Sequence, residues 1–141
     1  MTPTFESVYC LRDDKMSIES MQRGSLSDGP VGLRMTHGLV GSDQWWARQV
    51  EGTLQVTRVE GVISDFWPGQ WGDGPAEFAL RLESGNVSQW LCEIEPKQAA
   101  RLFQIGRLAA VTFVEQELKT AFAGSTSTKV VTVIALGPVI R

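Results

Sequence analysis

The chain has 141 residues, of which 43% are hydrophobic and 21% charged, and 13 basic against 16 acidic side chains give a formal net charge of −3. This length favours one domain, and this composition excludes a disordered chain, a collagen-like repeat and a coiled coil. No apolar run approaches the ~18 residues of a membrane span, and the acidic N-terminus lacks the basic and apolar regions of a secretory signal, so we expect a cytoplasmic protein without a membrane partner.

Residues 1–40 differ from the rest of the chain. They are rich in serine and glycine and show no sustained hydrophobic period. We therefore expect an irregular N-terminal arm, with one short strand at Ser7–Leu11. The glycines lack the GxGxxG spacing of a dinucleotide site, and no GK[ST] follows them, so we assign them to turns.

A short helix is predicted at 42–52. Ser42 is suited to cap its first turn, and Gly52 is suited to end it. Trp45 and Trp46 begin an apolar stripe with helical spacing, and we expect them to anchor the core rather than to hold a cofactor.

After this helix the hydrophobic period changes to two, which indicates strands. The first predicted strand, Leu54–Trp67, is long, and we expect a bulge near Arg58 and a bend at Gly61. Further strands are predicted at Ala76–Glu83, Val87–Ile94, Leu108–Lys119 and Lys129–Leu136, with a helix at Lys97–Ile105 after Pro96.

This order of three strands, a helix and two strands, with Gly61 inside the first strand, resembles the oligonucleotide/oligosaccharide-binding fold (OB-fold). The resemblance covers Leu54–Leu136 and involves no sequence motif. It implies a mainly β fold, a small five-stranded Greek-key barrel over 54–136 with a helix between strands three and four. The chain would then consist of an irregular arm at 1–40 and an OB-like domain at 41–141. Within that domain, the helix at 42–52 would be an addition to the barrel. The helix argues against sandwich and SH3-like folds with similar strand counts.

Proteins with this fold bind ligands on the face of strands two and three and through the loops between strands one and two and between strands four and five. Here these loops are Pro68–Pro75 and Thr120–Ser127. The resemblance implies binding of single-stranded nucleic acid, in which aromatic rings stack on bases and cations contact phosphates. The candidate residues in these loops, beside them or on the strands are Trp67, Trp71 and Phe122 for stacking, and Arg58, Arg81, Lys119 and Lys129 for phosphate.

The charge distribution keeps a second hypothesis open. Residues 54–95 carry two basic and seven acidic side chains, whereas 96–141 carry six basic and two acidic ones. Carboxylates around the first loop repel phosphate. Phe66, Trp67 and Trp71 could instead cover the end of the barrel, or form a protein-binding surface whose acidic rim selects a basic partner. The alternative function is therefore a protein-interaction or accessory subunit that uses the same surface.

We predict no enzymatic activity, no metal site and no cofactor. The two cysteines form no CxxC pair, and a single histidine leaves a zinc site short of its usual ligands. Carboxylate pairs such as Asp65 with Asp73, or Glu93 with Glu95, have no catalytic partner in a recognisable motif. The sequence does not indicate an oligomeric state.

Overall fold

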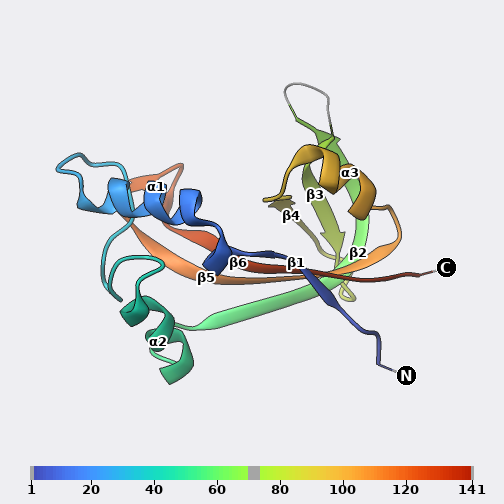
Figure 1. Cartoon of the computed structure of the whole chain (residues 1–141), viewed down its shortest axis with the longest axis horizontal. Helices are drawn as coiled ribbons and strands as arrows, with labels where there is room; N and C mark the ends of the chain where they lie inside the picture. Colours follow the sequence, from blue (N-terminus) through green and yellow to red (C-terminus); the bar gives the residue numbers. More distant parts are fainter. Residues whose placement is uncertain (1, 70–73, 141) are drawn as a thin grey trace. The chain divides into compact units, whose positions relative to one another are not determined.

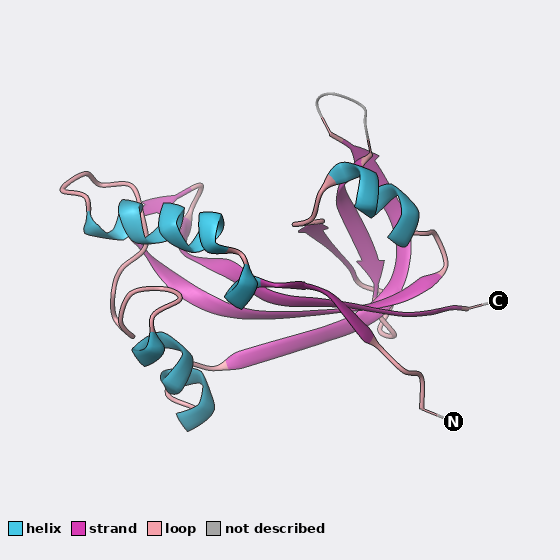
Figure 2. Cartoon of the chain, in the orientation of Figure 1, coloured by secondary structure: helices cyan, strands magenta, loops and turns pink. Residues whose placement is uncertain are grey.

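A computed structural model describes residues 2–69 and 74–140 of the chain, and strands dominate it (Figures 1 and 2). The mainly β fold class is therefore confirmed. Among these residues no helix has the length and apolarity needed to cross a membrane. In chain order the elements are β1 (Glu6–Cys10), the 3-10 helix η1 (Leu11–Asp13), α1 (Lys15–Leu26), α2 (Asp43–Glu51), β2 (Val56–Pro68), β3 (Pro75–Arg81), β4 (Val87–Leu91), α3 (Pro96–Leu102), β5 (Arg107–Phe122) and β6 (Ser125–Val139).

The described strands form one open antiparallel sheet in the order β1-β6-β5-β2-β3-β4. The expected order of three strands, a helix and two strands is present from β2 to β6. Closing these five strands into a barrel would require β4 to pair with β6, but β6 pairs with β1 on that side. The predicted OB-fold is therefore wrong, because the N-terminal strand occupies the edge that closure would use.

The chain divides into two compact units. Unit 1 comprises Met1–Tyr9, Arg58–Val111 and Val133–Arg141, and unit 2 comprises Cys10–Thr57 and Thr112–Thr132. In unit 1, α3 packs on one face of β3, where the rings of Phe78 and Phe103 lie 4.9 Å apart (Figure 1). This face of the β2–β3–β4 sheet is therefore part of the core.

The core of unit 2 is organised by a buried polar pair. Trp45, on α2, is fully buried, and its Nε1 donates a hydrogen bond to Oε1 of the buried Gln116 at 3.1 Å. The amide of Gln116 donates in turn to the carbonyl oxygen of Arg34 at 2.7 Å. One glutamine on β5 thus satisfies the indole of α2 and the backbone of the preceding loop, as buried polar groups require.

Helix α2 begins and ends as its sequence predicts. The Ser42 side chain accepts a hydrogen bond from the backbone N–H of Trp45 at 3.3 Å, and Gly52 adopts the left-handed conformation with φ +84°. Local capping chemistry therefore determines both ends of this helix.

Helix α1 lies in the segment that we expected to be irregular, and this part of the prediction is wrong. Asp14 caps its start, with its carboxylate accepting hydrogen bonds from the backbone N–H and the hydroxyl of Ser17 at 3.2 and 2.7 Å. At the other end, Lys119 of β5 donates to the carbonyl oxygen of Gly24 at 2.8 Å. A cation distant in the sequence therefore stabilises the end of α1. The residues of the helix alone do not indicate this contact, which is why the helix was not predicted. The strand expected near Ser7 is present as β1.

Strands β5 and β6 form a longer hairpin than expected. The predicted loop Thr120–Ser127 reduces to a two-residue turn, in which Ala123 has φ +50° and Gly124 has φ +81°. Two successive positive φ values are typical of a type I′ turn, whose twist matches that of the flanking strands. Alanine is an unusual first residue for this turn, which explains why no hairpin was predicted here.

The Trp45–Gln116 pair leads to a stability prediction. Gln116→Leu removes both hydrogen bonds and leaves the Trp45 indole N–H without its acceptor, so we expect a loss of roughly 2–4 kcal/mol in the free energy of unfolding. Urea denaturation measures this change. The matched control Gln55→Leu, at an exposed position, should stay within about 0.5 kcal/mol of the parent chain. Equal effects at both positions would contradict the role of Gln116.

The hairpin turn leads to a second prediction. Ala123→Asn places a residue that tolerates positive φ at the first turn position, so thermal and urea unfolding should show a gain of about 1 kcal/mol. Gly124→Ala is the opposite change and should destabilise the chain by a similar amount. If the free energy of unfolding is unchanged in both variants, residues 123 and 124 do not have the positive φ values of a type I′ turn.

Candidate protein-interaction surfaces

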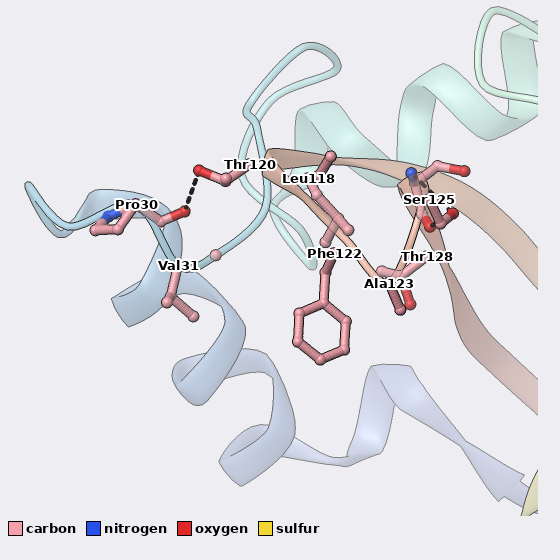
Figure 3. Close-up of a pocket in the computed structure, with 11 residues that line it drawn as sticks. Pro30, Val31, Leu118, Thr120, Phe122, Ala123, Ser125 and Thr128 are labelled. Atoms are coloured by element: carbon pink, nitrogen blue, oxygen red, sulfur yellow. Dashed lines mark hydrogen bonds between the residues drawn. The ribbon is translucent and has the colours of Figure 1, made fainter.

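An apolar groove lies in unit 2 at the tip of the β5–β6 hairpin, with a volume of about 520 Å³. Val31, in the segment after α1, and Phe122, at the end of β5, line it together with Pro30 and Leu118. In Figure 3 the side chains of Val31 and Phe122 project to the same side of the ribbon. Their exposed fractions of 81% and 77% leave both side chains available to a partner.

Backbone pairing holds the wall of this groove in place. The carbonyl oxygen of Gly32 accepts a hydrogen bond from the N–H of Lys119 at 3.0 Å, and the hydroxyl of Thr120 donates to the carbonyl oxygen of Pro30 at 3.0 Å (Figure 3). Gly32 has φ +132°, and a Cβ there would lie 2.5 Å from the carbonyl oxygen of Gly24. Only glycine lets the segment pass this close to α1.

A second candidate surface lies in unit 1, on the face of the β2–β3–β4 sheet opposite α3. We call it the open face. Its first row consists of Trp67, Glu77 and Leu91, which are paired across the three strands. Asp65, Ala79 and Gln89 form the next row, and Val62, Arg81 and Val87 form the third. Most of these side chains are exposed, with Ala79 buried at the centre.

A bulge in β2 decides which aromatic residue reaches the open face. Ile63 pairs with Leu80, and Asp65 pairs with Ala79, the neighbour of Leu80 on β3. Ser64 is therefore an extra residue in β2. Without this insertion, Trp67 would share the buried side of Ile63, since alternate residues of a strand share a face. The bulge turns Trp67 outward and aligns Phe66 with the core residue Phe78.

The pairing of β2 with β3 adds two details to the sequence interpretation. The register of β2 with β3 shifts between Ile63 and Asp65 and again between Trp67 and Pro68, and the bulge expected near Arg58 stays a prediction, because this pairing begins at Val62. Gly61 serves a close approach between strands, because a Cβ there would lie 2.7 Å from the carbonyl oxygen of Arg81.

The predicted phosphate-binding cations are distributed over both units. Arg58 forms an ion pair with Glu60 and lies 5.1 Å from the ring centre of Phe5. Lys119 binds carbonyl oxygens at the end of α1, and Lys129 lies over the ring of Phe113 at 5.2 Å. Arg81 is exposed on the open face of unit 1. Three of the four cations therefore have intramolecular partners.

The predicted stacking residues are also divided. Trp67 belongs to the open face of unit 1, and Phe122 belongs to the groove of unit 2. Trp71 lies outside the described residues. Sequence reasoning missed Val31 and Leu91, because only the pairing of distant segments places Val31 in the groove with Phe122 and Leu91 in one row with Glu77 and Trp67.

The inner side of the β2–β3–β4 sheet holds a buried thiol. The backbone N–H of Cys92 donates to the carbonyl oxygen of Ala76 at 2.8 Å, and the side chain is almost completely buried. Burial, together with the nearby carboxylates of Glu93 and Glu77, raises the pKa of Cys92 from 9.0 to about 12. The thiol is therefore a neutral core group at physiological pH.

Comparison with known proteins connects the chain to a protein family. A family model described as Immunity protein RhsI2 matches residues 5–136. The comparison with curated proteins gave no match.

This match overturns the main function predicted from the sequence. An immunity protein family is not a family of OB-fold nucleic-acid-binding proteins, so the predictions of that fold family and of single-stranded nucleic acid binding are wrong. The alternative hypothesis, a protein-interaction role, agrees with the match.

The raised pKa of the buried Cys92 thiol leads to a prediction about the pH dependence of stability. A raised pKa favours the neutral thiol in the folded state, so its contribution to stability is complete below pH 9 and is lost as the pH rises toward 12. Over this interval the free energy of unfolding should fall more steeply for the parent chain than for Cys92→Ala, by up to about 1.4 kcal/mol per pH unit. Between about pH 6 and 8 the difference should be constant. Parallel curves at alkaline pH would contradict the raised pKa.

Proposed function

The chain belongs to the RhsI2 immunity protein family, and we propose that it neutralises its cognate Rhs toxin by binding that protein directly. The observation that carries this proposal is the family match, which covers residues 5–136 and so includes both compact units. The chain then acts as an inhibitor that occupies its target, without a chemical step of its own. The cytoplasmic location expected from the sequence stays a prediction.

The surface chemistry supports a protein partner. Stable protein–protein interfaces centre on apolar and aromatic side chains within a polar rim. Both candidate surfaces have this character, since Phe122 and Val31 lie among small polar residues and Trp67 and Leu91 flank Glu77. Nucleic acid would instead require unpaired cations gathered in one field.

Inhibition by occupancy has a measurable signature. Titration of the purified chain into a fixed concentration of the cognate toxin, well above the dissociation constant, should lower toxin activity in direct proportion to the amount added. Activity should stop falling once the toxin is saturated, and the two proteins should co-elute in size-exclusion chromatography. A non-cognate Rhs toxin serves as the control and should keep its activity.

Two results would contradict the proposal. The first is the absence of a complex with the cognate toxin. The second is progressive inactivation by a small fraction of the chain, because one inhibitor molecule cannot occupy many toxin molecules at once.

A further inference from the structure

The open face of the β2–β3–β4 sheet presents exposed apolar side chains on the side of the sheet opposite α3. Leu91 and Val87, on the edge strand β4, are 55% and 60% exposed, and Trp67 on β2 is 36% exposed. Helix α3 packs on the opposite face through Phe78 and Phe103. The buried side thus belongs to the core, and the open face presents large apolar groups to solvent.

The sequence around this face is strongly acidic. Between Glu60 and Glu95 there are seven acidic residues and one basic residue, Arg81. The exposed carboxylates include Asp65 and Glu77, which lie on the open face beside Trp67. Among the described residues, neither carboxylate has an ion-pair partner.

The cations nearest in sequence lie on a different surface. Lys97 and Arg101 are exposed on α3, which covers the other side of the sheet. The open face thus carries Asp65 and Glu77 beside Trp67 and one cation, Arg81, in its third row, whereas Lys97 and Arg101 lie on the helix that covers the other side. The influence of Glu77 on the buried thiol of Cys92 agrees with a negative potential at this end of the sheet.

From these observations we infer that the open face is the surface that binds the toxin, and that it receives a basic region of that protein with Trp67 and Leu91 as apolar anchors. This inference rests on the proposed function. A lysine- or arginine-rich surface satisfies the carboxylates of Asp65 and Glu77, and a flat aromatic group between charges is a frequent centre of binding energy. The groove at Phe122 has no comparable excess of charge, which is why charge complementarity favours the open face.

Binding measurements with the purified full chain and the toxin that it neutralises test this inference. Trp67→Ala should raise the dissociation constant roughly 30-fold or more, as expected for a central interface residue. The matched control Phe122→Ala truncates an exposed aromatic residue of unit 2 and should change the constant by less than about threefold. Thermal unfolding of each variant verifies that the fold is retained.

Charge reversal provides an independent second variant. Glu77→Lys should lower the association rate about tenfold and weaken its dependence on salt between about 0.05 and 0.5 M. Glu19→Lys makes the same change on α1, where the side chain is exposed, and should leave the association rate close to that of the parent chain.

The outcomes separate this inference from the function on which it rests. If the parent chain forms no complex with the toxin, both are overturned. If the parent chain binds but Trp67→Ala and Glu77→Lys bind equally well, the open face is not the site and the immunity function stands. Loss of binding in Phe122→Ala alone would assign the toxin to the groove instead.

Discussion

The register of the β2–β3–β4 sheet decides what this protein presents to a partner. Because side chains alternate across a strand, a slip of one residue would exchange the buried and exposed faces. The extra residue Ser64 makes this exchange within β2, so that Ile63 faces the core while Trp67 faces outward. Pairing with Glu77 and Leu91 then places an aromatic ring, a carboxylate and an aliphatic side chain in one row. The proposed binding surface depends on this single bulge.

The packing of the β2–β3–β4 sheet explains why its open face is accessible to a partner. Phe78 and Phe103 fix α3 to the inner side, whereas most side chains on the other side are exposed. Exposed apolar groups of this kind commonly mark interaction sites in soluble proteins. The chain belongs to an immunity protein family, and the proposed neutralisation by binding requires a surface that makes a stable contact with the toxin. The surrounding carboxylates add selectivity for a basic partner.

Local chemistry made part of this structure predictable. Ser42 and Gly52 marked the ends of α2, and the period of two revealed the strands from β2 to β6. Helix α1 escaped prediction because Lys119, 95 residues from Gly24, stabilises its end, and the hairpin escaped because Ala123 is an unusual type I′ residue.

The functional surfaces were harder to predict, since they depend on pairing between distant segments. Trp67 was singled out as a binding residue, but its neighbour Leu91 was not. The predicted barrel failed because the alternation at Ser7–Leu11 indicated a strand but did not indicate that it would pair with β6.

Hydrogen–deuterium exchange on the chain, alone and bound to its toxin, tests the central claim most directly. If the open face is covered, backbone amides of residues 62–67 and 87–91 exchange more slowly in the complex, while those at the tip of the β5–β6 hairpin keep their rate. Slower exchange confined to the hairpin tip, with residues 62–67 and 87–91 unchanged, would contradict the assignment.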